Sequence, residues 1–263
     1  MKAFFALPAL VWAMLSAAAA QDMTRFLDLK SDEFTKAEMT RADIEAALAA
    51  ASPSGSVDLS GKRLNGLDLS GLDLRRTRLQ TARLNRANLA GANLDGVVLD
   101  QAWALDADLT RASLKGASLF MTQLMGAKLD AADLSGARIT GDLSRASMLQ
   151  ARFDGADFSA DMRNQSMGLI RGVLRSAKLD GASFEGADLS RAVLEFASLR
   201  NANLKGAKLR GSELGGADFN EADVTDADFE DADVVSTRLL GLRGRDKARN
   251  LDRARNLDRA FRD

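Results

Sequence analysis

Residues 82–109 read ARLNR ANLAG ANLDG VVLDQ AWALD ADL, with an apolar residue, nearly always leucine, at the third position of every five. The same phase extends from Leu59 to Ile139, where fifteen of the seventeen central residues are leucine. It returns from Leu174 to Leu239, where all fourteen central residues are apolar. Self-similarity at a fixed short period over so much of the chain is the signature of a repeat architecture.

The five-residue period determines which side chains face inward. In extended backbone, residues two apart point to the same side. The central leucine and the residue two positions before it, usually alanine, therefore face inward together, and the residue between them faces outward. The other two positions are rich in Gly, Ser, Asp, Asn and Arg, which suits a bend. Four such sides close a coil of about twenty residues, and stacked coils form an all-β solenoid with a spacing of ~4.8 Å.

The repeats occupy two blocks, residues 57–158 and 174–240, and resemble the pentapeptide-repeat family, whose motif is A(D/N)Lxx in tandem. Four repeats carry the motif verbatim: Ala107-Asp108-Leu109, Ala132-Asp133-Leu134, Ala187-Asp188-Leu189 and Ala202-Asn203-Leu204. The resemblance implies a right-handed quadrilateral β-helix, which agrees with a coil of four short sides.

The period lapses between the two blocks. It slips when Ile139 is followed by a centre at Leu143, and it is lost across residues 159–173, where we expect an irregular break within the solenoid. Insertions in solenoids usually bulge on one face, often the binding face. Met162 and Met167 either belong to such a surface or plug the core of an irregular side.

The N-terminal segment, residues 21–56, should cap the first coil, because a solenoid end exposes unpaired strand edges and a hydrophobic cross-section. Thr40 and Asp43 resemble a capping box, and an apolar stripe at helical spacing follows them. We therefore expect a short capping helix over residues 35–51.

The C-terminal tail, residues 241–263, is basic and repeats the sequence Ala-Arg-Asn-Leu-Asp-Arg at 248–253 and 254–259. Its apolar residues fall on one helical stripe. We expect a helical tail, or an irregular one, lying against the last coils.

Residues 1–20 read MKAFFALPALVWAMLSAAAA, in which Lys2 precedes an apolar stretch and a run of alanines precedes Gln21. This pattern is typical of a cleaved secretory signal peptide. A membrane anchor is the alternative, but Pro8 and the small alanines make the stretch marginal as a spanning helix. We expect export through the general route to the periplasm or the medium.

The composition excludes several kinds of chemistry. The 263 residues include no Cys, His or Tyr, which removes thiolates, the commonest general base and the commonest zinc ligand. Apolar residues make up 46% of the chain but aromatic residues only 5%, so Leu and Ala must fill a thin core without a pocket. We therefore expect no catalytic residue, no metal and no cofactor. The net charge of −1 also argues against whole-chain attraction to nucleic acid.

The region between residues 213 and 233 holds nine acidic residues and no basic one. Asp218, Asp223, Asp228 and Asp233 take the outward position of four successive sides, so they should ring the C-terminal end of the rod. The ring is a solvated surface partly neutralised by the tail, a weak divalent-cation site, or a mimic of DNA phosphates. The third reading comes from the resemblance, because some pentapeptide-repeat proteins of the quinolone-resistance type bind type II topoisomerases with a DNA-like acidic rod.

A second candidate surface is apolar. Trp103 is an outward residue, Leu105 lies at the corner of the same side, and Phe120, Met121 and Met125 follow one coil later. Leu105 and Met125 should stack directly, and the others should flank one shared edge. Contiguous exposed apolar groups often mark an interaction surface. The alternative is that a loop, the N-terminal segment or the tail covers them.

These features predict a non-catalytic, exported β-solenoid that acts as a rigid scaffold or protein-interaction module for an unidentified protein. The alternative function is binding of a type II topoisomerase by DNA mimicry, as in gyrase protection. Local acidity, balanced charge and expected export all disfavour this alternative. We expect no binding to nucleic acid and no membrane attachment after signal cleavage. Dimerisation is not indicated, because both ends should be capped.

Overall fold

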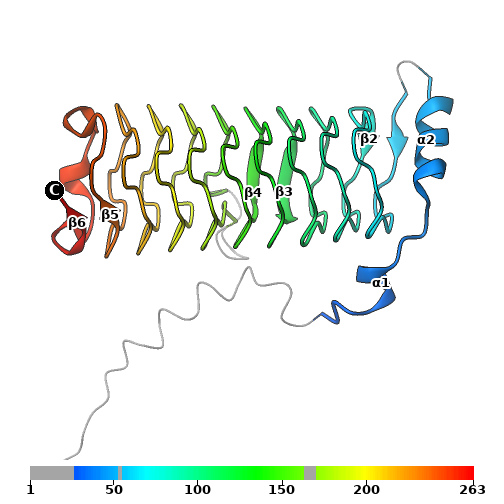
Figure 1. Cartoon of the computed structure of the whole chain (residues 1–263), viewed down its shortest axis with the longest axis horizontal. Helices are drawn as coiled ribbons and strands as arrows, with labels where there is room; N and C mark the ends of the chain where they lie inside the picture. The colour runs from blue at the N-terminus through cyan, green and yellow to red at the C-terminus, as the bar shows by residue number, and fades with distance from the viewer. Residues whose placement is uncertain (1–26, 53–54, 163–169) are drawn as a thin grey trace, which may run out of the picture.

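The computed structural model describes residues 27–52, 55–162 and 170–263, which form a straight stack of coils (Figure 1). Neighbouring coils pair in parallel at a spacing of twenty residues, as in the bridges from Arg83 to Trp103 and from Trp103 to Gln123. Because the sequence period is five, each coil has four sides. The predicted solenoid and the predicted inward and outward positions are therefore confirmed.

Most sides pair through a single bridge, so regular elements are short. The helices are α1 (Asp32–Thr35), α2 (Arg41–Ala50) and the 3₁₀ turns η3 (Arg245–Lys247), η4 (Leu251–Arg253) and η5 (Leu257–Arg259). The strands are β1 (Val57–Asp58), β2 (Thr77–Arg78), β3 (Ser118–Gln123), β4 (Arg138–Asp142), β5 (Arg238–Leu239) and β6 (Phe261–Arg262). They pair in parallel as β1 with β2, β3 with β4 and β5 with β6.

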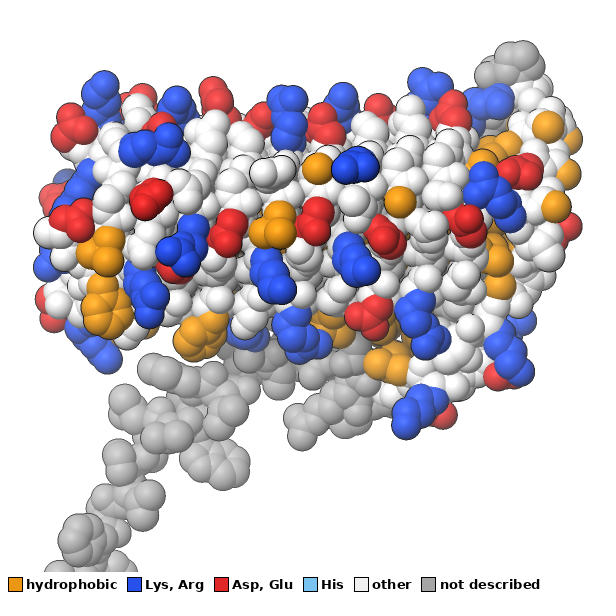
Figure 2. All heavy atoms as spheres, in the orientation of Figure 1, with side chains coloured by type: hydrophobic (Ala, Val, Ile, Leu, Met, Phe, Trp, Pro, Cys, Tyr) orange, Lys and Arg blue, Asp and Glu red, His pale blue; other side chains and the backbone are white. Residues whose placement is uncertain are grey.

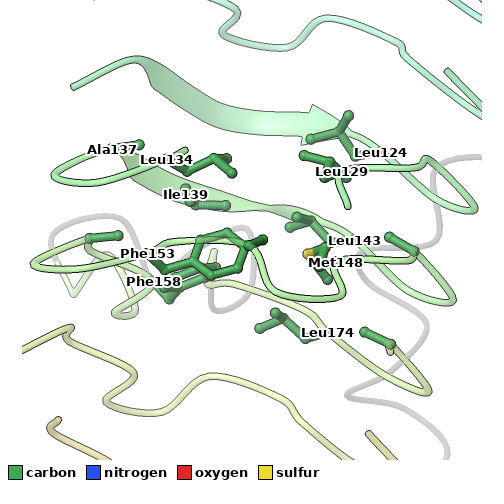
Figure 3. Packing of buried hydrophobic residues seen from close by; sticks show 14 of the residues in the cluster. Leu124, Leu129, Leu134, Ala137, Ile139, Leu143, Met148, Phe153, Phe158 and Leu174 are labelled. Carbon is green, nitrogen blue, oxygen red and sulfur yellow. The ribbon is translucent and has the colours of Figure 1, made fainter. Parts of the chain in front are cut away.

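The interior is a continuous column of the central leucines and the alanines two positions before them, all buried (Figure 3). Where a hydroxyl replaces an inward alanine, it donates to a nearby backbone carbonyl. Thr122 Oγ1 donates to the Leu99 carbonyl and Thr237 Oγ1 to the Leu214 carbonyl, both at 2.8 Å. These buried polar groups are therefore part of the packing and form no site.

Phenylalanines replace leucine at several centres, both beside the break and in the last regular coil. Phe153 stacks on Phe184 with ring centroids 4.8 Å apart, and Phe158 meets Phe153 edge to face at 5.4 Å. The last regular coil alternates Phe229 and Val234 at adjacent fully buried centres, so large and small side chains share the cross-section.

Two irregularities explain the loss of sequence phase. Gln123 pairs with Asp142, nineteen residues on, after a register shift between β3 and β4. Asp142 then pairs with Val173, so the next coil is eleven residues longer than the regular coils. The additional residues leave the stack after Phe158 and return at Gly172, whose N–H donates to the Phe158 carbonyl at 2.9 Å.

Both irregular places use a glycine because backbone or core atoms approach closely. A Cβ on Gly141 would lie 2.2 Å from the Thr122 carbonyl oxygen. A Cβ on Gly172 would lie 2.8 Å from Cδ1 of Phe158. Neither glycine can gain a side chain without displacing the neighbouring coil.

At the N-terminal end, α2 covers the first coil and buries Ile44 completely (Figure 1). Thr40 and Asp43 form the expected capping box, so the helix begins at Arg41, later than the predicted residue 35. The preceding residues are extended instead: Ala37 pairs with Leu64, which caps an edge of the first coil.

The C-terminal tail is neither an α-helix nor loose. Residues 241–263 form a final coil, the capping coil, in which each 3₁₀ turn starts at a left-handed residue, Gly244, Asn250 or Asn256. Each of these sides is six residues long, which matches the repeated Ala-Arg-Asn-Leu-Asp-Arg sequence. The helical stripe was misleading because asparagine readily adopts the left-handed conformation and bends the chain at every repeat.

Candidate functional site

The most irregular side of the rod carries Trp103, and we call it the Trp103 face. Its outward residues, in axial order, are Arg63, Arg83, Trp103, Gln123, Asp142, Val173, Val193, Glu213, Asp233 and Arg255. Several are buried, although this position is solvent-exposed in a plain repeat: Trp103 is 7% exposed, Gln123 4% and Val193 2%. The additions to the solenoid therefore gather on this face.

Trp103 is covered by the N-terminal segment, which is one of the two alternatives that the sequence left open for this residue. Its ring packs edge to face against Phe34 of α1, with centroids 5.2 Å apart. Phe34 is itself only 5% exposed. The N-terminal segment shields Trp103 because an unpaired indole on the rod surface would expose a large apolar area to water.

The other four apolar residues are half-buried and do not share one edge. Phe120 and Met121 lie at the corner before the Trp103 face, whereas Leu105 and Met125 lie at the corner after it. Leu105 and Met125 occupy equivalent positions of neighbouring coils, as expected, because Trp103 pairs with Gln123. These residues therefore flank the face on both sides, and whether they bind a partner stays a prediction.

Two asparagines tie the N-terminal segment to the rod. Asn65 Nδ2 donates to the Glu33 and Lys36 carbonyls at 2.9 and 3.0 Å, and Asn85 Nδ2 donates to the Phe34 carbonyl at 3.3 Å. Asn85 Nδ2 also donates to Asn65 Oδ1 at 3.0 Å, which links the two coils. Both asparagines are almost fully buried, so their hydrogen bonds to the backbone carbonyls are shielded from water.

Arg83 completes this contact. Its Nη2 donates to Glu33 Oε1, its Nη1 donates to the Thr81 carbonyl at 2.8 Å, and its guanidinium lies 5.2 Å from the Phe34 ring centroid. Arg83 Nε is buried and has no hydrogen-bond partner within the described part of the chain. Beside this cluster is a groove of about 110 Å³, lined by Leu29, Phe34, Asn85, Arg86, Leu105 and Asp106.

Sequence reasoning missed Phe34, Arg83, Asn65 and Asn85. Asn65 and Asn85 carried a usable signal, because asparagine recurs at the same corner of two successive coils. Phe34 carried none, because it lies outside the repeats and its contact with Trp103 is distant in sequence.

The four candidate acidic residues lie as predicted on the four sides of one coil. Each pairs through a bridge with an arginine of the following coil: Asp218 with Arg238, Asp223 with Arg243, Asp228 with Arg249 and Asp233 with Arg255. The preceding coil supplies further cations, since Lys205 lies 3.5 Å from Asp223 and Arg200 3.8 Å from Asp218. Asp218, Asp223 and Asp228 thus each form an ion pair with a cation of the preceding coil, whereas Asp233 follows Glu213 in its ladder.

Asp228 is the most enclosed of the four, at 3% exposed. It accepts hydrogen bonds from Arg210 Nε at 2.7 Å and from Asn250 Nδ2 at 2.8 Å. Burial alone would raise the pKa of Asp228, but the hydrogen bonds from Asn250 and Arg210 outweigh it and hold the pKa below its ordinary value. The carboxylate therefore anchors the capping coil.

Many other surface carboxylates also serve the rod itself. Asp95 Oδ1 accepts from Ser113 Oγ and from the Lys115 N–H, and the same arrangement recurs at Asp130 with Ser147 and Leu149. Figure 2 shows acidic and basic side chains interspersed along the visible face of the rod. This surface forms no continuous acidic stripe of the kind that resembles DNA.

The predicted break is a bulge whose described ends are residues 159–162 and 170–173. The Asp161 N–H donates to the Ile170 carbonyl at 2.8 Å. Met162 is 47% exposed and does not plug the core, whereas Met167 lies outside the described residues. The core at this level is filled by Phe158 and Leu174 instead.

Two further searches cover only the described parts of the chain. No group of three or more acidic side chains is arranged there to hold a metal ion. No helix within those ranges is long and apolar enough to cross a membrane.

The geometry defines a β-solenoid with four-sided coils built from five-residue repeats. The family model for pentapeptide repeats matches in eight copies, at residues 63–101, 82–119, 107–141, 173–206 and 197–234. These regions cover more than half of the sequence, so the chain belongs to the pentapeptide repeat family, whose fold is the right-handed quadrilateral β-helix.

A solved structure gives the same fold. The chain is similar to HetL, a pentapeptide repeat protein involved in heterocyst differentiation regulation from the cyanobacterium Nostoc sp. strain PCC 7120. The identity is 27%, the TM-score is 0.57, and the match covers 85% of this chain and 94% of HetL. QnrB1, a plasmid-mediated fluoroquinolone resistance protein, matches with 17% identity and a TM-score of 0.39, over 79% of this chain and 92% of QnrB1. No curated protein matches the sequence.

Proposed function

We propose that this protein is a non-catalytic, exported pentapeptide-repeat rod that serves as a rigid scaffold or protein-interaction module in the periplasm or outside the cell. The observation that carries this proposal is the use of the described polar groups. The interior is apolar, and the hydroxyls at the inward positions of the repeat donate to backbone carbonyls, whereas the buried Thr140 Oγ1 has no hydrogen-bond partner among the described residues. The side chains of many surface aspartates accept hydrogen bonds within the corner turns or from the next coil. What the rod offers to other molecules is a long surface of fixed shape.

Rigidity supports a scaffold role because each coil is held by its neighbours on all four sides. A partner that docks on several coils meets groups whose spacing is already set, so little conformational entropy is lost on binding. The comparison with HetL supports the fold behind this proposal and leaves the partner open.

Acidic mimicry of DNA receives no support from the charge arrangement. In the ring, Asp218, Asp223 and Asp228 each form an ion pair with an arginine or lysine of the preceding coil, and each of the four aspartates lies beside an arginine of the following coil. A phosphate-like surface needs carboxylates that are free to meet a basic partner.

Site-specific photo-crosslinking in intact cells tests the proposal. The crosslinking residue is placed at one exposed corner position on each edge of the rod: Gln101, Phe196, Asn201 and Asp226. A scaffold should give a reproducible adduct of one size from at least one edge, absent when the purified protein is irradiated alone. Equal, diffuse labelling from all four edges, or substrate turnover by the purified protein, would contradict the proposal.

A further inference from the structure

The N-terminal segment, residues 27–38, binds the rod as a ligand binds a preformed site, and we call it the resident segment. Of this segment, only Phe34 is buried. The rod contributes an aromatic wall from Trp103, a guanidinium from Arg83 and amide donors from Asn65 and Asn85. Each group recognises a different part of a peptide: a ring, a carboxylate or a backbone carbonyl.

The recognition is specific for an acidic residue followed by an aromatic one. Arg83 forms an ion pair with the Glu33 carboxylate and also faces the Phe34 ring, so one guanidinium contacts both side chains. A planar guanidinium can do this because it donates in its plane and stacks through its face. The asparagine amides contact backbone carbonyls, which any sequence supplies.

The resident segment fills this site incompletely. Among the described residues, the buried Arg83 Nε has no hydrogen-bond partner, a state that costs free energy in a folded protein. The groove of about 110 Å³ next to Phe34 is lined by Leu29 and Phe34 of the resident segment and by Asn85, Arg86, Leu105 and Asp106 of the rod, so the rod's part of it remains open to a ligand. A peptide that adds an acceptor for Arg83 Nε and an apolar side chain for the groove fits better than the resident segment.

We infer that Arg83, Asn65, Asn85 and Trp103 form a peptide-docking site, and that a partner protein binds there through a carboxylate-aromatic peptide that replaces the resident segment. This inference deepens the proposed interaction role and rests on it. Charge complementarity favours this occupant, because Arg83 forms an ion pair with Glu33 of the resident segment and Arg86 lines the adjoining groove. Covalent attachment gives the resident segment an effective concentration on the order of millimolar, so the better fit is what allows displacement.

Tryptophan fluorescence reports directly on this site. The chain has two tryptophans, Trp12 and Trp103, so Trp12→Phe leaves Trp103 as the single fluorophore of the full chain. In this background, Phe34→Ala empties the aromatic position without shortening the protein. The emission of Trp103 should shift to longer wavelength, and its indole ring should become more accessible to quenching by acrylamide. Phe34→Leu, which keeps an apolar side chain, is the second variant in case the alanine variant folds poorly.

The probe is a synthetic peptide of residues 27–38, LDLKSDEFTKAE. Added to the Phe34→Ala or Phe34→Leu protein, it should return the Trp103 emission toward its original wavelength in a saturable manner. A peptide with alanine in place of its phenylalanine should bind at least tenfold more weakly. Arg83→Gln in the protein should also weaken binding at least tenfold, and the protein with Phe34 intact should require at least tenfold more peptide.

Three results would overturn the inference: no saturable change up to millimolar peptide, binding that ignores the phenylalanine, or binding that ignores Arg83. Mixed dimers of Phe34→Ala and unaltered chains in sedimentation would also overturn it, since the occupant would then be the segment of a second copy. Photo-crosslinks from the rod edges without peptide binding would disprove the peptide-docking site only. The broader interaction role would stand.

Discussion

Gly141 lies directly beneath Thr122, so close that a Cβ on the glycine would be 2.2 Å from the threonine carbonyl oxygen. This contact occurs where Gln123 pairs with Asp142, at the coil that is one residue short. The missing residue draws two coils together, and only a residue without a side chain fits between them. The position therefore tests how the rod accommodates a change of register.

Gly141→Ala should destabilise the protein by about 2–3 kcal/mol, because the added methyl meets backbone that cannot move without breaking the ladder. Thermal or urea unfolding measures this change. Gly186→Asn is the matched control: its site is open, its φ of +66° is left-handed, and Asn201 occupies the same conformation elsewhere. We expect a change within ~0.5 kcal/mol there. Equal effects of the two substitutions would contradict the steric explanation.

The alternation of Phe229 and Val234 predicts a compensating pair. Phe229→Leu should leave a cavity and Val234→Leu should overpack the coil, each costing about 1–2 kcal/mol. The double variant should lose less than the sum of the two, because total volume is nearly conserved. A double-mutant cycle from urea unfolding measures the coupling, and strict additivity would show that the two side chains do not share space.

Asp228 should hold the capping coil in place. Asp228→Ala leaves the donors of Arg210 and Asn250 without their acceptor, at a cost of about 2 kcal/mol. Because the capping coil is rich in arginine and lysine, trypsin should release it faster in this variant, which mass spectrometry follows. Asp246→Ala, an exposed acid in the same coil, is the control and should leave the cleavage rate unchanged.

Acid should destabilise the rod below pH 4. Asp108, Asp133, Asp188 and Asp223 have lowered pKa values: burial raises each one, but hydrogen bonds from residues two further on outweigh it. Hydrogen bonding from Arg75 lowers the pKa of Asp73 to about 2. Since the unfolded state takes up protons first, this stabilisation is present above the unfolded pKa of about 4 and is lost as the pH falls toward 2. Melting temperatures at pH 6, 4, 3 and 2 measure the loss.

Two asparagines at the same turn position provide the basis for a control for acid sensitivity. Asn88 and Asn93 accept the same backbone hydrogen bonds as the aspartates, at 3.1 Å, without titrating. Asp108→Asn with Asp133→Asn should therefore keep the turns and flatten the pH dependence. An unchanged acid profile would mean that other groups govern it.

Export makes a prediction about the N-terminus. The protein recovered from the periplasm or medium should begin at Gln21, because the alanine run before it fits signal peptidase. N-terminal sequencing and intact mass measure this directly. Recovery of full-length protein from the cytoplasm alone would remove the premise of an extracellular partner.

The repeat predicted the rod well because its information is local. A central leucine and an inward alanine decide the orientation of one side whatever the rest of the chain does, and Thr40 with Asp43 decided where α2 begins. Contacts without a periodic signal were beyond reach. For Trp103 the sequence left exposure and coverage both open, and only the structure brings Phe34 over it. The prediction of a helical tail failed for a different reason. The six-residue period of the capping coil places apolar residues on a helical stripe, but its left-handed asparagines bend the chain into sides.

The coil that holds the break joins Asp142 to Val173 and yet keeps its place in the stack. In a globular domain, eleven extra residues near the core would have to be absorbed by the surrounding packing. Here they leave after Phe158 and re-enter at Gly172, which are joined by a hydrogen bond, and the coils on either side still pair in parallel. Evolution can therefore vary a side loop of this rod, and a protein engineer can graft a foreign sequence there, without changing the spacing at which the remaining surface is displayed.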